Sequence, residues 1–252
     1  MDKTLYILTG ASRGLGAAIA AQLITPGSQL LCISRHDSAE LQAKAVAGGA
    51  RLTQWQRDLA NPALVAHELT RWLATLDPAG FERACLINNA GVISRIGPVD
   101  DCEDADLSRA LRVGLEAPLL LAAAFLRATA KWPVARRILN ISSGLGRHAM
   151  AGAAVYCAAK AGLDNLSRAM ALDEAARPNG VRIVSLAPGV IDTDMQIQLR
   201  SADPTGFPDQ ANFIAMKTQG SLASASEAAR QVVAFLNRAD FGDQVLADVR
   251  QG

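Results

Sequence analysis

The stretch Thr4-Leu5-Tyr6-Ile7-Leu8-Thr9-Gly10-Ala11-Ser12-Arg13-Gly14-Leu15-Gly16 decides the fold that we expect for this chain. Its first six residues are a short apolar run typical of a buried strand, and Gly10 ends the run. An Ala-rich helical pattern follows and continues to about Ile24. A strand, a glycine-rich turn and a helix start form the first half of a dinucleotide site, where the glycines let the backbone approach a pyrophosphate at the helix N-terminus. Glycine-rich turns are common, and the position of this one after the first strand is what favours the dinucleotide interpretation.

The end of the next predicted strand, Gln29 to Ser34, indicates which dinucleotide binds. An NAD site usually places Asp or Glu there for the ribose 2′-hydroxyl, whereas an NADP site offers Arg. This chain has Ser34 and Arg35, with Asp37 only afterwards, and a second arginine, Arg13, in the glycine-rich turn. We therefore expect Arg13 and Arg35 to hold a 2′-phosphate, which favours NADPH. The alternative for Arg35 is an ordinary solvated residue at a strand end.

Further short apolar runs have the length and composition of strands, and helical patterns separate them. Strands that alternate with helices predict an α/β fold with a parallel sheet. No repeat, low-complexity tract or linker interrupts the chain, so we expect one domain over residues 1–252. The further strands are predicted at Ala50 to Gln56, Ala84 to Ile87, Arg137 to Ile141, Val181 to Leu186 and Gln244 to Ala247.

Two helical patterns carry local predictions. The long pattern from Asp101 to Leu126 contains Pro118, which predicts a kink or a break because proline has no N–H to donate. The broad apolar side of this pattern predicts packing against both the sheet and a partner subunit. The final pattern, Ser226 to Asn237, is amphipathic, and Ser226 is its predicted N-cap.

Several strand ends carry polar or small residues, and ligands bind at the carboxyl edge of open α/β sheets. Asp58-Leu59 follows the third strand, and Asp58 either accepts a hydrogen bond from an adenine amino group or caps the helix that opens at Asn61. Asn88-Asn89-Ala90-Gly91 closes the fourth strand, and its small residues leave room for a ribose and a nicotinamide. The loop from Pro188 to Thr193 leaves the sixth strand over the same face.

A second group of residues predicts proton-transfer chemistry. Tyr156 and Lys160 are four residues apart, so on a helix they stand on one face. A cationic Lys beside a phenol lowers the pKa of the Tyr, which would let Tyr156 donate and accept a proton near neutral pH. Ser143, at the end of the fifth predicted strand, can hydrogen-bond a substrate oxygen. A Tyr and a Lys at this spacing, taken without other motifs, are more often a buried Tyr and a surface Lys. His148, in the loop between Ser143 and Tyr156, is either a substrate contact or an exposed residue.

The composition excludes several kinds of protein. Hydrophobic residues make up 50% of the chain and aromatic residues only 4%, which suits strands covered by Ala-rich helices. The net charge of +1 argues against nucleic acid or an anionic membrane as the main partner. No signal-peptide layout is present, and the apolar run from Ala117 to Leu126 is too short to span a bilayer. The four cysteines form no CxxC pair and the three histidines are scattered, so we expect reduced thiols, a cytoplasmic location and no metal site.

Residues 192–222 interrupt the alternating pattern with Met195, Phe207, Phe213 and Met216 among polar residues and prolines. An insertion of this length at the ligand edge predicts a lid or a substrate wall rather than a linker.

Taken together, the chain resembles the short-chain dehydrogenase/reductase family over essentially its whole length. The resemblance implies a single Rossmann-type, doubly wound parallel sheet of seven strands in the order 3-2-1-4-5-6-7, with helices on both faces, in a homodimer or homotetramer. The matching elements, in chain order, are Thr9-Gly10-xxx-Gly14-x-Gly16, Asp58, Asn88-Asn89-Ala90-Gly91, Ser143, Tyr156-xxx-Lys160 and Pro188-Gly189…Thr193.

The resemblance also implies roles for these residues. Tyr156 is the general acid/base, Lys160 lowers its pKa and holds the nicotinamide ribose, and Ser143 orients the substrate carbonyl. Thr193 holds the nicotinamide carboxamide, and the hydride comes from the cofactor. The residues expected to contact the cofactor are Gly10, Ser12, Arg13, Gly14, Leu15, Gly16, Ser34, Arg35, Asp58, Leu59, Asn89, Ala90, Gly91, Tyr156, Lys160, Pro188, Gly189, Val190, Ile191 and Thr193.

One position departs from the family pattern. The family usually has an Asn in the long middle helix, where it supports a water relay behind the Lys. Here the corresponding stretch is Val113-Gly114-Leu115, and Gly114 has no side chain for that role. The proton relay is therefore expected to be rearranged, water-filled or slow, while Ser143, Tyr156 and Lys160 still predict activity.

Within the family, the last third is most similar to the sepiapterin reductase and benzil reductase branch. The run Asp192-Thr193-Asp194-Met195-Gln196 carries this resemblance, together with Ser142-Ser143-Gly144 and Tyr156-Cys157-Ala158-Ala159-Lys160. The branch implies NADPH-dependent reduction of a ketone beside another carbonyl, on a pterin side chain or an aromatic diketone. The alternatives are an alcohol dehydrogenase or 3-oxoacyl reductase of the same family, and a non-catalytic protein that senses NADP(H).

Overall fold

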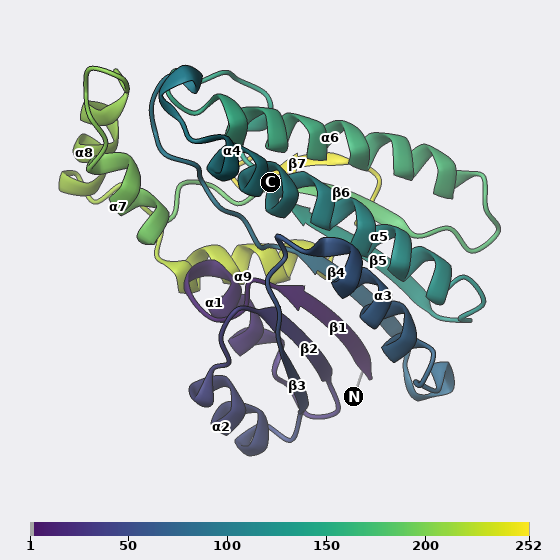
Figure 1. Ribbon diagram of the computed structural model, residues 1–252. Coiled ribbons are helices and arrows are strands. Elements are labelled where there is room, and N and C mark those ends of the chain that lie inside the picture. Colours follow the sequence, from purple (N-terminus) through teal and green to yellow (C-terminus); the bar gives the residue numbers. More distant parts are fainter. Residues whose placement is uncertain (1–2, 252) are drawn as a thin grey trace.

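Seven parallel strands form one sheet in the order β3-β2-β1-β4-β5-β6-β7 in the computed structural model (Figure 1). This confirms the predicted fold class and strand order. The structure describes residues 3–251, so the ends of the predicted domain, residues 1–2 and 252, lie outside it. The strands are β1 (Thr4–Thr9), β2 (Gln29–Ser34), β3 (Arg51–Gln56), β4 (Arg83–Asn88), β5 (Ala135–Ile141), β6 (Arg182–Ala187) and β7 (Leu246–Asp248).

The interior strand β1 is buried along its whole length, and its side chains alternate between two hydrophobic cores. Tyr6 and Leu8 pack into the core on one face of the sheet. Leu5 and Ile7 pack into the core on the other face. A strand that is covered on both faces must be apolar at successive positions, which is why this segment is a continuous apolar run.

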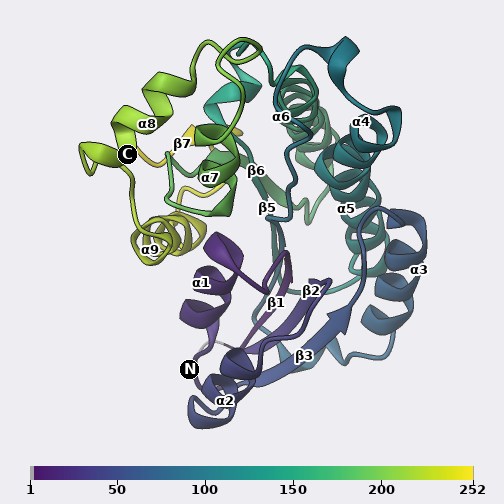
Figure 2. The same ribbon diagram turned by 60° about the vertical axis from the view of Figure 1, so that its left-hand side comes forward.

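Helices cover both faces of the sheet, as Figure 2 shows. α1, α2 and α9 contribute Ile19, Leu41 and Val232 to one core. α3 and α5 contribute Leu69 and Phe125 to the other. The helices are α1 (Gly14–Leu23), α2 (Ala39–Ala47), α3 (Pro62–Leu73), α4 (Asp104–Leu111), α5 (Ala117–Ala128), α6 (Ala154–Ala175), α7 (Asp194–Arg200), α8 (Gln210–Thr218) and α9 (Ala225–Leu236).

The long helical pattern is interrupted near Pro118, as the sequence predicts. A π-helical turn, η3 (Arg112–Glu116), separates α4 from α5, and the N–H of Ala117 donates to the carbonyl of Arg112, five residues back. Pro118 has no N–H and cannot bond the carbonyl of Gly114, four residues before it. The wider turn lets the helix continue past the proline.

The last helix begins at Ala225, one residue earlier than predicted, and the assignment of Ser226 as its N-cap is wrong. Ser224 is the N-cap: its Oγ accepts from the N–H of Glu227 at 3.2 Å, and its own N–H donates to Glu227 Oε2 at 3.1 Å. This reciprocal pair is a capping box. The last strand is also shifted, to Leu246–Asp248, because it pairs in parallel with the end of β6.

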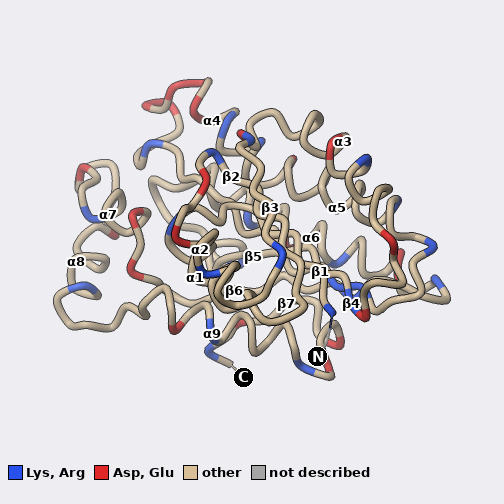
Figure 3. The backbone as a smooth tube through the Cα atoms, turned by 90° about the horizontal axis from the view of Figure 1, so that it is seen from below, with Lys and Arg blue, Asp and Glu red and all other residues tan. Residues whose placement is uncertain are grey.

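Acidic and basic residues are interspersed along the whole backbone (Figure 3). Within residues 3–251, no helix combines the length and the apolar character needed to cross a bilayer.

The capping box generates a stability prediction. Replacing Ser224 by Ala removes the side-chain acceptor for a helix N–H, so we expect the free energy of unfolding to fall by about 1 kcal/mol. The matched control is Ser226→Ala, an exposed position in the same first turn, which is expected to change stability by less than about 0.5 kcal/mol. Urea denaturation measures both, and a larger effect at Ser226 would contradict the assignment.

Candidate active site

One cavity of about 690 Å³ lies at the carboxyl ends of the strands. Every residue predicted to contact cofactor or substrate lines it. The chain supplies them from six places: Gly10, Ser12, Arg13, Gly14, Leu15 and Gly16 after β1; Ser34 and Arg35 at β2; Asp58 and Leu59 after β3; Asn89, Ala90 and Gly91 after β4; Ser143 after β5, with Tyr156 and Lys160 on α6; and Pro188, Gly189, Val190, Ile191 and Thr193 after β6.

The glycine-rich turn has no room for side chains at its tightest points. A Cβ on Gly10, whose φ is +73°, would lie 2.9 Å from Ala90 Cα, and a Cβ on Gly16 would lie 2.1 Å from the carbonyl oxygen of Gly10. Arg13, at the N-cap of α1, makes no capping hydrogen bond, and the first turn holds no acidic residue. The N–H groups that open α1 are therefore available to an anion in the cavity.

The loop after β4 is fastened to the same turn. Thr9 Oγ1 accepts from the N–H groups of Asn89 and Ala90, both at 3.0 Å. The Asn89 side chain donates back to the carbonyl of Thr9 at 3.0 Å. These bonds fix the wall formed by Ala90 and Gly91 against the glycine-rich turn.

At the end of β2, the nearest acid is held away from the cavity. Ser34 and Arg35 line the cavity and Asp37 does not. Asp37 Oδ2 instead accepts from the side chain of Gln56 at 2.9 Å. Arg13, the second arginine of this region, forms an exposed ion pair with Asp194 at 2.6 Å.

Asp58 does not cap α3, so that alternative from the sequence is wrong. The N-cap is Asn61, and Asp58 Oδ1 accepts from the N–H of Ala60 at 2.9 Å within the preceding turn. Its other oxygen lies 4.0 Å from the Arg109 guanidinium. Arg109 comes from α4 and also lines the cavity.

Ser143, Tyr156 and Lys160 meet at the centre of the cavity. Lys160 is only 4% exposed, its Nζ donates to the carbonyl of Ile141 at 2.7 Å, and it lies 5.6 Å from the centroid of the Tyr156 ring. Tyr156 forms a side-chain hydrogen bond with Ser143. Ser143 Oγ also accepts from the N–H of Leu145 at 3.2 Å, which fixes its orientation.

The structure reverses one electrostatic prediction. Burial raises the pKa of Tyr156, and the hydrogen bond with Ser143 only partly offsets this. Burial also lowers the pKa of Lys160 to about 8, with a smaller opposing effect from Asp164. The prediction from sequence that Tyr156 has a lowered pKa is therefore wrong here, because desolvation of the phenolate outweighs the hydrogen bond with Ser143.

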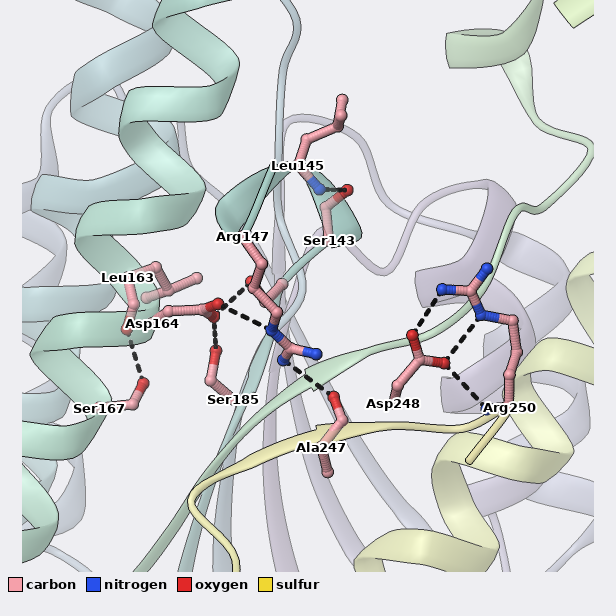
Figure 4. A network of polar contacts seen from close by, with 11 residues as sticks. Ser143, Leu145, Arg147, Leu163, Asp164, Ser167, Ser185, Ala247, Asp248 and Arg250 are labelled. Atoms are coloured by element: carbon pink, nitrogen blue, oxygen red, sulfur yellow. Dashed lines mark hydrogen bonds and ion pairs between the residues drawn. The ribbon is translucent and has the colours of Figure 1, made fainter. Parts of the chain in front are cut away.

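A buried carboxylate holds the end of β5 in place (Figure 4). Asp164, one helical turn after Lys160 on α6, is 3% exposed. It accepts hydrogen bonds from Ser142 Oγ and Ser185 Oγ, both at 2.6 Å, and from Arg147 Nε at 3.3 Å. Arg147 in turn donates to the carbonyl of Ala247 at 3.0 Å. Asp164 therefore joins α6 to the end of β5 and to β6, and Arg147 extends the link to β7, beside Ser143.

Two helices, α7 and α8, cover one side of the cavity. Asp192 accepts from Lys217 at 2.6 Å and lies 3.9 Å from Arg200, so the segment is tied at both ends. Gln210 donates to the carbonyls of Arg200 and Ala202. The cavity residues on these helices that the site prediction omitted are Asp194, Met195, Gln196, Leu199, Phe213 and Met216.

Other cavity residues had no local sequence signal. Arg250 comes from the turn after β7 and forms a bidentate ion pair with the buried Asp248. Arg109 comes from α4 and lies 4.0 Å from Asp58, which follows β3. His148 lines the cavity and is also exposed, so both of its predicted alternatives stay open. Only the folded topology brings these residues together.

The cysteines and the acidic residues form no metal site in the described part of the chain. Between residues 3 and 251, no three His, Cys, Asp or Glu side chains are placed to hold a metal ion. All four cysteines are free, and burial raises the pKa of both Cys32 and Cys85 to about 12.

The Asp164 network generates a second prediction. Both serine hydroxyls bond Asp164 Oδ1, which an Asn can keep, but Asp164→Asn replaces the oxygen opposite Arg147 by an NH₂ group and removes the charge there. The free energy of unfolding should therefore fall by about 2–3 kcal/mol. Asp173→Asn, at an exposed position on the same helix, is the matched control and should cost less than about 0.5 kcal/mol. Urea denaturation compares the two variants, and equal effects would show that Asp164 does not hold this edge.

Known proteins are similar to this chain in sequence and in fold. A family model for short chain dehydrogenase matches residues 4–204. Benzil reductase ((S)-benzoin forming) from Bacillus cereus is 32% identical over 235 residues, 93% of this chain and 94% of that protein. Sepiapterin reductase from Meriones unguiculatus is 32% identical over 246 residues, 93% of this chain and 92% of that protein. A metagenomic short-chain oxidoreductase solved with NADP superposes with a TM-score of 0.71 at 28% identity, covering 98% of this chain and 95% of that one. The chain therefore belongs to the short-chain dehydrogenase/reductase family, near its benzil reductase and sepiapterin reductase branch.

Proposed function

We propose that this oxidoreductase uses NADPH to reduce a ketone, one carbonyl of a vicinal dicarbonyl, to a secondary alcohol. The observation that carries the proposal is the meeting of Ser143, Tyr156 and Lys160 in one cavity with the glycine-rich turn. The names of the relatives support the substrate class. Benzil carries two adjacent carbonyls, and the side-chain ketone of sepiapterin stands beside a carbon that carries a hydroxyl.

The residues around the glycine-rich turn fit a dinucleotide. Gly10 and Gly16 leave no space for side chains, and the uncapped start of α1 suits a pyrophosphate. Arg35 lines the cavity where a 2′-phosphate would lie, and Asp37 is engaged by Gln56 outside it. This charge distribution favours NADPH over NADH. Bound NADPH would supply the hydride.

In this proposal Tyr156 donates a proton to the developing alkoxide, and Ser143 hydrogen-bonds the same oxygen. A raised pKa keeps the phenol protonated at neutral pH, as a proton donor to the carbonyl oxygen requires. Lys160, with a pKa lowered to about 8, is able to pass on a proton in the same pH range. Its Nζ is fixed by the carbonyl of Ile141.

The wall opposite the cofactor residues is largely apolar. Met195 and Leu199 on α7, Phe213 and Met216 on α8, and Met150 all line the cavity. Flexible thioethers and an aromatic ring suit a flat apolar substrate. We propose that residues 192–222, which include α7 and α8, form the substrate lid of a single domain.

Gly114 favours a second candidate, the NADP(H) sensor. Gly114 is buried in the π-helical turn, and a Cβ there would lie 3.1 Å from Ala159 Cβ, beside Lys160 on α6. This packing leaves little space for the Asn that the family usually has. A sensor would bind NADPH tightly without reducing any carbonyl.

A substrate panel separates the candidates. We would follow NADPH oxidation with benzil, a phenyl diketone, sepiapterin and a 3-oxoacyl thioester, and test the reverse reaction with the corresponding alcohols. Turnover of the diketones or of sepiapterin supports the proposal, and turnover of the thioester alone favours a 3-oxoacyl reductase. NADPH binding with no turnover supports the sensor. The expectations of a cytoplasmic homodimer or homotetramer, with no nucleic acid or membrane partner, stay predictions.

The role of Tyr156 is tested by Tyr156→Phe. The phenyl ring keeps the packing and removes the only proton that we assign to the carbonyl oxygen, so the rate should fall at least ~100-fold. NADPH affinity, measured by fluorescence titration, should stay within about 2-fold because the ring makes no charged contact. Retained turnover would contradict the general-acid role.

The role of Arg35 is tested by Arg35→Ala. Loss of a charge-assisted contact with the 2′-phosphate should weaken NADPH binding by about 10–100-fold. NADH lacks that phosphate, so its affinity should change by less than about 3-fold. Arg51→Ala, an exposed arginine at the start of β3 outside the cavity, is the control. Equal losses for both cofactors would remove Arg35 from the phosphate site.

A further inference from the structure

Arg250 is a cavity residue that the proposed chemistry does not use. It follows β7, it is exposed, and it lines the cavity. The carboxylate of Asp248, whose side chain is 4% exposed, holds its guanidinium: Nε donates to Oδ1 at 2.9 Å and Nη2 donates to Oδ2 at 2.5 Å. The same Oδ1 accepts from the backbone N–H of Arg250 at 2.9 Å. A buried carboxylate thus fixes a long side chain that would otherwise move freely in water.

The guanidinium of Arg250 keeps free donors on its other side. An arginine carries five N–H groups in a rigid, planar arrangement that can bind two partners at once. The bonds with Asp248 use the fork formed by Nε and Nη2. Nη1 has no hydrogen-bond partner among residues 3–251, and Figure 4 shows it directed away from Asp248. The second fork, formed by Nη1 and the remaining N–H of Nη2, is therefore available to an acceptor in the cavity.

The position of Arg250 in the fold favours the substrate over the cofactor phosphates. Arg13 and Arg35, the arginines expected at a phosphate, follow β1 and β2, whereas Arg250 follows β7 at the far edge of the sheet. Ser143 follows β5, in the same half of the sheet as β7. A Cβ on Gly189, in the loop after β6, would lie 4.0 Å from Arg250 Cδ. The stem of Arg250 thus passes beside that loop, in the half of the cavity where the proposed reaction takes place.

The charges around Arg250 indicate what kind of acceptor fits. Arg250 is paired with Asp248, and Arg147, whose charge also acts on Asp248, is paired with Asp164 at 3.3 Å. The positive and negative charges of this group cancel. A substrate carboxylate would add an unbalanced negative charge here, whereas a neutral carbonyl oxygen would accept the same N–H groups without one.

We infer that Arg250 donates to the second, non-reacting carbonyl oxygen of a vicinal dicarbonyl, while Ser143 and Tyr156 bind the reacting one. Adjacent carbonyl dipoles repel when they lie parallel, so the two oxygens point apart and suit donors on different walls. Arg250 then selects dicarbonyls over simple ketones. This inference rests on the proposed reductase function and names the residue that determines its substrate class.

The test compares benzil with deoxybenzoin, which has the same two rings and a methylene in place of one carbonyl. Arg250→Met keeps an unbranched stem and removes the guanidinium. We expect kcat/KM to fall by about 10–100-fold for benzil and by less than about 3-fold for deoxybenzoin, because only benzil loses a charge-assisted hydrogen bond. Comparing the ratio of the two substrates between proteins cancels their different intrinsic reactivity.

Two further variants make the test specific. Arg250→Lys guards against a loss of folding, because an ammonium keeps the ion pair with Asp248 but has no second fork, so the ratio should fall here too. Arg230→Met, at an exposed position on α9 outside the cavity, is the matched control and should leave the ratio unchanged. NADPH affinity, measured by fluorescence titration for each variant, reports whether the cofactor site is intact.

Three results would overturn the inference. If both substrates lose the same factor in both Arg250 variants, the residue acts only by pairing with Asp248. If NADPH affinity falls together with activity, the guanidinium contacts the cofactor. If the ratio does not move, the free fork has no acceptor on the substrate.

Failure of the proposed function is distinguishable from these results. If the wild type turns over neither ketone, equilibrium binding of benzil and of deoxybenzoin to the protein with NADP⁺ replaces kinetics. Tighter binding of benzil that is lost in Arg250→Lys then supports the inference without the reductase function. A wild-type protein that binds both compounds equally, or neither, overturns the inference.

Discussion

The active-site geometry depends on the buried carboxylate of Asp164. A carboxylate with 3% exposure is stable only when its oxygens are fully hydrogen-bonded. Ser142, Ser185 and Arg147 meet this need, and they come from β5, β6 and the loop before α6. The same bonds set the position of Ser143 relative to the helix that carries Tyr156 and Lys160. Burial of one charge thus fixes the relative positions of three groups that the proposed chemistry requires.

Much of the fold and the site could be predicted from the sequence, because both depend on local signals. Apolar runs such as Thr4 to Thr9 mark strands that are covered on both faces. In a parallel sheet, every strand end meets the same edge, so residues chosen for following a strand are brought together by topology alone. This is why residues as distant as Gly10, Ser143 and Thr193 line one cavity.

The N-cap of α9 was missed although its signal is local: Ser224 has Glu three residues later to complete a capping box and Ser226 does not. The rest depended on distances that a sequence does not contain. The pKa of Tyr156 depends on how deeply the phenol is buried, and burial outweighs the opposing hydrogen bond with Ser143. Arg250 and Arg109 enter the cavity from elements with no motif of their own.

The π-helical turn η3 has a consequence for the two helices that it joins. Such a turn holds one residue more than a regular turn, so it changes the angular phase between α4 and α5 by about 100°. Arg109 and Val113 line the cavity before or within the turn, and Phe125 packs against the sheet after it. The single extra residue sets the rotation of α5 relative to α4. A one-residue deletion in this segment would turn either the cavity-facing side chains of α4 or the sheet-facing side chains of α5 away from their contacts, while leaving the helical content almost intact.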